Sequence, residues 1–218
     1  MRINRLIILS TLIIILGIVV IVLSIKIYQQ PKRDQPMMMM GNNMKGMMRK
    51  MMSGILPSGI TPNDLPDPGS VGAKLMDRYC TQCHALPSPE MHTAEEWPPI
   101  ADRMFSRMSM MSGMEGMKMM DIKNPSHHEK QEIIAYLLSH AMKAIMPGSI
   151  PSPQSRGAIA FMNICSRCHA LPDPKSYSAA QWPKIVAWMR SNMRVMGKGT
   201  MTDKEEKEIL SYLTSNAK

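Results

Sequence analysis

Aromatic residues and cysteines are scarce in this sequence. Its 218 residues include two phenylalanines, three tryptophans and five tyrosines. Small domains bury little apolar surface, so units built from this sequence need another source of bulk in their cores. All four cysteines fall in two stretches, CTQCHALPSP from Cys80 and CSRCHALPDP from Cys165. No cysteine is left for any other purpose.

Charged residues are missing from the run between Leu6 and Ile25. At about 1.5 Å per residue, a helix of this length can cross a bilayer. A secretory signal has a small-residue cleavage site after its apolar region, and the sequence around Lys26 offers no such site. The sequence therefore predicts an uncleaved membrane anchor within residues 1–28. Basic residues flank both ends of the run, so charge alone does not orient it.

Residues 29–69 contain many methionines, prolines and glycines but no aromatic residue. Such a composition buries little surface and predicts a tether that is mobile in its proline-rich parts. Nine methionines lie between Met37 and Met52, and thioethers are ligands for Cu(I). Several of them also follow helical spacing beside Lys45, Arg49 and Lys50, which favours a short basic amphipathic helix on an anionic membrane or a partner. Both interpretations stay open.

The rest of the chain contains an internal duplication. An offset of 85 residues places Cys80 on Cys165, Cys83 on Cys168, His84 on His169, Trp97 on Trp182, Met108 on Met193 and Met111 on Met196. The first copy carries about nine extra residues before its last element. Prolines and serines between 147 and 155 are typical of a linker. We therefore expect two small domains, residues 70–146 and 156–218.

Helical signals recur in both copies. A short helix is expected to lead into each cysteine pair, and a second to begin near each tryptophan, where apolar residues follow helical spacing. Ser126 with Glu129, and Thr202 with Glu205, have the spacing of a capping box at the start of a third helix. No segment alternates as a strand does. The predicted fold class is all-α.

The sequence Cys-x-x-Cys-His is the attachment motif of c-type haem. Two thiols form thioethers with the vinyl groups, and the histidine reaches the iron. One helical turn brings both sulfurs to the same porphyrin edge. A thioredoxin-like redox pair or half of a zinc site are the rival interpretations, and two copies that each keep the histidine argue against both. The motif predicts two covalently bound haem c groups, which also supply bulk to small cores. The attaching and ligating residues are Cys80, Cys83, His84, Cys165, Cys168 and His169.

Each copy resembles a class I cytochrome c. The shared features are a glycine before the motif (Gly72, Gly157), a tryptophan in the middle helix, a methionine-bearing loop and a tyrosine in the last helix (Tyr136, Tyr212). The resemblance covers residues 70–217 and implies electron transfer by two tandem cytochrome c domains, with the last helix crossing the first. Because haem c is attached outside the cytoplasm, it also implies haem domains that face the periplasm or the cell exterior.

The sequence indicates the distal iron ligand less clearly than the proximal ligand, which is the histidine of the motif. The second copy has no histidine after His169, so methionine is the usual remaining choice there. Met196 lies beside Gly197, where the resemblance places the ligand loop, and Met111 is its equivalent. The less favoured candidates are Met108, Met120, Met193 and Met201. The first copy leaves further options open, because it also holds His92, His127, His128 and His140.

Trp97 and Trp182 occupy equivalent positions near the start of the middle helix. Under the resemblance, these tryptophans pack against the haem edge or donate a hydrogen bond to it. The alternative is a purely structural place in the core. The sequence does not separate the two.

These features predict a membrane-anchored dihaem electron carrier between a membrane or periplasmic donor and a terminal acceptor, and not an enzyme in its own right. A dihaem enzyme with one open iron, peroxidase-like, and a copper-handling protein are the alternatives. The net charge of +9 comes without a nucleic-acid motif. It favours acidic redox partners whose encounter is steered by charge, and no nucleic-acid partner is expected.

Overall fold

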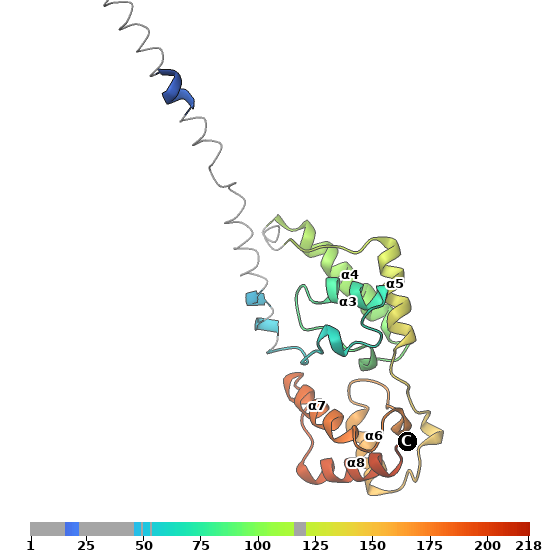
Figure 1. The fold of residues 1–218 in the computed structure, drawn as a ribbon. Coiled ribbons are helices and arrows are strands. Elements are labelled where there is room, and N and C mark those ends of the chain that lie inside the picture. Colours follow the sequence, from blue (N-terminus) through green and yellow to red (C-terminus); the bar gives the residue numbers. More distant parts are fainter. Residues whose placement is uncertain (1–15, 22–45, 49, 53, 116–120) are drawn as a thin grey trace, which may run out of the picture. The chain divides into compact units, whose positions relative to one another are not determined.

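The computed structural model of the protein describes residues 16–21, 46–48, 50–52, 54–115 and 121–218 (Figure 1). The chain divides into two compact units, Met1–Met40 and Gly41–Lys218. Every named element among the described residues is helical, and the only β contacts there are isolated bridges, Ile60 with Leu86 and Ala144 with Pro172. The predicted all-α class is confirmed.

The larger unit holds two successive sets of three helices. The first set is α3 (Val71–Cys80), α4 (Trp97–Gly113) and α5 (His127–Ser139). The second is α6 (Arg156–Cys165), α7 (Trp182–Val195) and α8 (Asp203–Ser215). Both capping boxes form at the predicted places, with Ser126 and Thr202 as the N-cap residues of α5 and α8. We refer to the two sets as the first and second repeats.

The first and last helices of each repeat pack against each other, α3 on α5 and α6 on α8. Glycine permits this close crossing, because a Cβ at Gly157 would lie 2.6 Å from the carbonyl oxygen of Glu208. Gly72 faces Tyr136 in the same way in the first repeat. The Tyr212 hydroxyl donates to the carbonyl of Pro151 at 3.1 Å, so the tyrosine fixes the crossing to the chain that precedes α6. The expected crossing is confirmed in both repeats.

Each repeat has a hydrophobic core of its own. Met76, Trp97, Phe105 and Ile133 are buried in the first, and Phe161, Trp182, Ile209 and Leu213 in the second. The first core also includes Leu65 and contacts Ile60 and Met48. Ordered packing therefore begins inside the segment that the sequence analysis assigned to the tether.

The middle helices of the two repeats differ in length. α4 has 17 residues and α7 has 14. α7 ends before Gly197, which adopts a φ of +62°, a left-handed conformation that glycine accepts without steric cost. The equivalent residue of the first repeat is Ser112, which remains helical. One glycine thus accounts for the earlier end of α7.

The predicted anchor lies mostly outside the described residues. Residues 16–21 are helical and exposed. Among the residues that the structure describes, no helix combines the length and apolar character needed to cross a membrane.

Candidate haem sites

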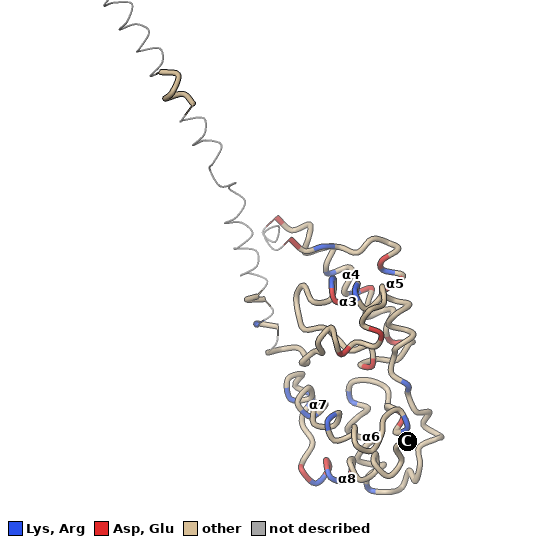
Figure 2. Tube along the Cα trace, viewed as in Figure 1, with Lys and Arg blue, Asp and Glu red and all other residues tan. Residues whose placement is uncertain are grey.

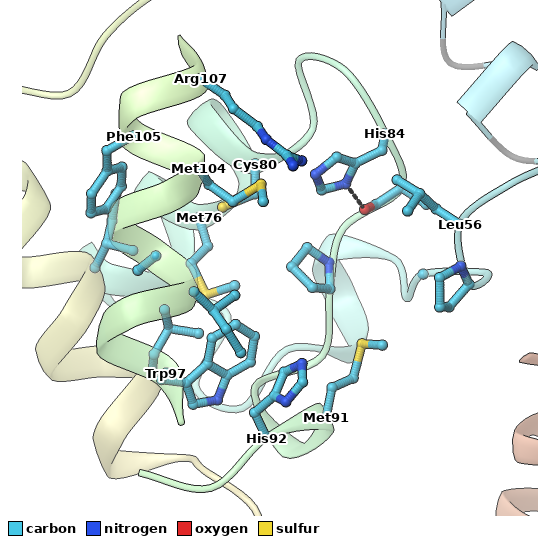
Figure 3. Close-up of a pocket in the computed structure, with 18 of the residues that line it drawn as sticks. Leu56, Met76, Cys80, His84, Met91, His92, Trp97, Met104, Phe105 and Arg107 are labelled. Atoms are coloured by element: carbon cyan, nitrogen blue, oxygen red, sulfur yellow. Dashed lines mark hydrogen bonds between the residues drawn. The ribbon is translucent and has the colours of Figure 1, made fainter. Parts of the chain in front are cut away.

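Each repeat contains a cavity bordered by its Cys-x-x-Cys-His motif. The first is lined by Cys80 and His84 together with side chains of α4, among them Trp97, Met104 and Arg107 (Figure 3). The second is lined by Cys165, Cys168 and His169 together with α7. Cys83 packs at the edge of the first core. Both cavities have predominantly apolar linings, as expected for a site that receives a porphyrin.

The two motif histidines are oriented identically. His84 Nδ1 lies 2.7 Å from the carbonyl oxygen of Ala85 (Figure 3), and His169 Nδ1 lies 2.7 Å from that of Ala170. A carbonyl oxygen only accepts hydrogen bonds, so Nδ1 carries the proton in both rings. In a neutral imidazole this hydrogen bond leaves the lone pair on Nε2, the arrangement that a metal-ligating histidine needs.

The first cysteine of each motif ends a helix, Cys80 in α3 and Cys165 in α6. Burial raises the pKa of each of these two thiols to about 12. Among the described residues, no three His, Cys, Asp or Glu side chains gather as a metal site.

The methionines differ between the two cavities. Met189, Met193, Met196 and Met201 all line the second cavity with His169. Met196, immediately after α7, is 41% exposed, whereas Met201 is 2% exposed. The described methionines that line the first cavity are Met52, Met76, Met91, Met104 and Met108.

Met111 is not brought into the cavity with His84. Because α4 continues to Gly113, Met111 stays within the helix and packs partly buried against the first core. The sequence equivalence with Met196 therefore does not extend to position. Met108, one of the alternative candidates, lines the first cavity, and Met120 lies outside the described residues.

Trp97 and Trp182 line the two cavities, but their N–H groups are already used. Trp97 Nε1 donates to the carbonyl of Pro89 at 2.7 Å, and Trp182 Nε1 donates to that of Pro174 at 3.0 Å. An indole has a single donor. Each ring is consequently available to a cofactor only for packing.

One layer of side chains belongs to both cavities. Pro57, Met91 and His92 line the first and the second cavity alike, and Glu90 and Met142 of the first repeat also line the second. Burial lowers the pKa of His92, so its imidazole is neutral near pH 7. No motif in the sequence indicates this shared wall. The repeat offset does place His92 on Tyr177, and in the structure the two rings meet Trp97 and Trp182 alike, with centroids 5.0 Å apart.

Asn192 provides a buried donor in the second cavity that has no partner within the protein. Its side chain is 7% exposed, and its Nδ2 makes no hydrogen bond. Its Oδ1 accepts from the Ser58 hydroxyl at 3.3 Å, and Ser58 Oγ in turn accepts from Trp188 Nε1 at 2.9 Å. Buried donors are normally satisfied. The residues of this cavity thus fit a bound group that has acceptor atoms, as haem has.

Comparison with protein-family models, with curated proteins and with solved structures finds no match to this chain. Assignment of a function therefore depends on the residues of the two cavities and on the sequence motifs that form them.

Proposed function

We propose that the protein is a membrane-anchored dihaem electron carrier in which each repeat is a domain of the class I cytochrome c type. The observation that carries this proposal is the pair of equivalent cavities, each bordered by Cys-x-x-Cys-His and joined by a common wall. Covalently bound haem would supply a one-electron iron couple at each site.

The residues have distinct proposed roles. Cys80, Cys83, Cys165 and Cys168 attach the two haem c groups, and His84 and His169 provide the proximal Nε2 ligands. Met196 is the proposed distal ligand in the second cavity. In the first cavity Met108 takes that role in place of Met111, because Met108 lines the cavity.

The shared wall supports electron exchange within one chain. Pro57, Met91 and His92 each line both cavities, so the two cavities share part of their boundary. Neutral His92 adds no charge to this boundary. Two adjoining sites would let the protein accept an electron at one repeat and release it at the other.

The proposed setting is the cytoplasmic membrane, with Leu6–Ile25 as a single span and the repeats on the periplasmic or outer side. The net charge of +9 supports acidic redox partners. Lys and Arg are spread over both repeats together with Asp and Glu (Figure 2).

The first test is an optical and mass analysis of the purified, haem-loaded full chain. We expect two covalent haems per chain, a ferric sulfur-to-iron band that accounts for both, and a ferrous spectrum that CO does not change. A chain that carries no haem would overturn the proposal.

A second candidate is a dihaem enzyme with one open iron, as in a peroxidase. The position of Met111 outside the first cavity favours it. In this case one haem lacks the sulfur band and binds CO, and the site of binding is the first repeat.

A copper-handling role remains as a third candidate. Met47 and Met51 are 65% and 58% exposed, whereas Met48 packs against the first core. Stoichiometric Cu(I) binding that is lost on deletion of residues 37–52 would support this role, and unchanged haem content would separate it from misfolding.

A further inference from the structure

The two cavities carry different charges at equivalent positions. Arg107 of α4 lines the first cavity and reaches toward His84 (Figure 3). The repeat offset places Arg107 on Asn192, which lines the second cavity. A guanidinium is charged at any physiological pH, whereas an amide is neutral. The same place in the two repeats is therefore cationic in one and neutral in the other.

The neutral amide is held in place by two other residues. Asn192 Oδ1 accepts from Ser58, and Ser58 accepts from Trp188, so the amide is fixed with its nitrogen unpartnered inside the second cavity. Trp188 is the tryptophan that has no counterpart in the first repeat, where Arg103 stands at its position. The second repeat is thus built to hold an uncharged donor where the first has an arginine.

A carboxylate adds to this difference. Glu90 belongs to the first repeat but lines the second cavity, where it accepts a hydrogen bond of 2.7 Å from the Tyr177 hydroxyl. Burial, together with Glu90, raises the pKa of Tyr177, so the phenol keeps its proton and donates the hydrogen bond to the Glu90 carboxylate. The lysines that share a polar cavity with Glu90, namely Lys143, Lys175 and Lys218, are not among the residues that line either haem cavity.

We propose that Arg107 and Glu90 set the order of the two reduction potentials, with the higher potential at the first repeat. This inference rests on the proposed function. Ferric haem carries one more positive charge than ferrous haem, so a nearby cation favours the reduced state and a nearby anion favours the oxidised state. Arg107 and Glu90 are both exposed, so solvent screens part of the effect of each charge and the expected shifts in midpoint are modest.

The order of potentials gives electron flow a direction. One electron moves from the reduced second site to the oxidised first site, so that the second is oxidised and the first reduced. Electrons therefore collect at the first repeat, which directly follows the tether. Arg107 and Glu90 act on this step through charge alone.

The test is a spectroelectrochemical titration of the haem-loaded full chain and of two neutralised variants. We expect two resolved midpoints in the wild type. Arg107→Gln should shift the higher midpoint downward, and Glu90→Gln should shift the lower midpoint upward, so that each variant narrows the gap. Arg103→Gln and Glu95→Gln are matched controls, because both residues are exposed and lie outside the linings of both cavities.

Arg107→Lys guards against a purely structural effect. It keeps the charge, so its midpoints should remain near those of the wild type even where Arg107→Gln shifts them. Two haems per chain with midpoints that neither variant moves would overturn this inference and leave the proposed function standing. A downward shift of the lower midpoint by Arg107→Gln would reverse the proposed order and also overturn it. A chain without haem would overturn both.

Discussion

In both repeats, the motif histidine and the tryptophan that line the cavity are held in the same way. The parts of the cavity formed by the end of the middle helix differ between the repeats. Both motif histidines donate to the next residue's carbonyl at 2.7 Å, and both tryptophans donate to a proline carbonyl. The middle helices end at different points, and the cavities differ at Arg107 and Asn192. The two repeats therefore share the residues that would hold a cofactor, and they differ in the residues that would adjust its reduction potential.

The largest difference between the repeats is expected when the attaching cysteines of one repeat at a time are removed. The second cavity uses side chains of the first repeat, Glu90, Met91 and His92, whereas the residues that line the first cavity all precede residue 138. Cys165→Ala with Cys168→Ala should leave one haem per chain. Cys80→Ala with Cys83→Ala should reduce the haem content below one.

Mass spectrometry of the intact chains measures this difference directly. The two double variants serve as controls for each other, because each removes the same number of thiols. Equal haem content in both would show that the two repeats load independently, contrary to this prediction.

The next largest effect concerns the distal methionines. Met196 lines the second cavity with His169, and Met111 packs against the first core. Met196→Ala should remove the sulfur-to-iron band of one haem and open it to CO. Met111→Ala should leave both bands intact. Ferric spectra and CO difference spectra of the two variants measure both effects. Loss of a band in Met111→Ala would contradict this prediction and show that Met111 ligates an iron as Met196 does.

The helix crossings offer a smaller effect, on stability. An added Cβ at Gly72 would clash with the Cβ of Tyr136, and one at Gly157 would lie 2.6 Å from the Glu208 carbonyl oxygen and from the Cβ of Tyr212. Neither contact is with the mobile end of a side chain, so the backbone has to shift in both repeats. Gly72→Ala and Gly157→Ala should each cost about 1–3 kcal/mol through overpacking. Denaturant unfolding followed at each repeat measures both costs, and Gly148→Ala is a control because its Cβ would meet open space.

The smallest expected effect is the acid sensitivity of the two capping boxes. Backbone hydrogen bonds from Ser126 and Thr202 hold the pKa of Glu129 and Glu205 below the ordinary value of 4.5. A lowered folded-state pKa contributes stability that is present above pH 4.5 and is lost as the pH falls through the folded-state pKa. Glu129 also accepts from the Tyr79 hydroxyl at 2.9 Å.

Glu129→Gln should therefore flatten the acid side of the stability profile more than Glu205→Gln does. Thermal unfolding between pH 3 and pH 7, an interval that brackets ordinary carboxyl pKa values, measures both profiles. The exposed Glu95 provides the control in Glu95→Gln. An unchanged profile in both variants would mean that other carboxyls dominate acid unfolding.

Local signals predicted the framework of the repeats well. Capping boxes, the tryptophan positions and the glycine–tyrosine pairs lie within short segments or at a fixed offset, so the sequence carries them directly. The distal side was harder to predict, because an offset transfers residue identity but not helix length. Gly197 ends α7 while Ser112 lets α4 continue, and this moved Met111 away from the place of Met196.

The shared wall could not be obtained from sequence alone, nor could the presence of Arg107, Asn192 and Glu90 in the cavity linings. They depend on contacts between segments far apart in the chain, such as Ser58 with Asn192 and Glu90 with Tyr177. No periodicity or motif links such residues. The unpartnered donor of Asn192 can be recognised only when the residues around it are known.

The path of the segment before α3 has a mechanical consequence. Ile60 pairs with Leu86 of the first repeat, while Ser58, two residues earlier, bonds to Trp188 and Asn192 of the second. The strap from Ser58 to Ile60 therefore fastens both copies at once. The two repeats can separate, by force on the preceding chain or by a hinge motion at residues 147–155, only after these contacts of Ser58 or Ile60 break. Proteolytic cleavage between Ser58 and Ile60 would separate the contacts to the two repeats without touching either Cys-x-x-Cys-His motif.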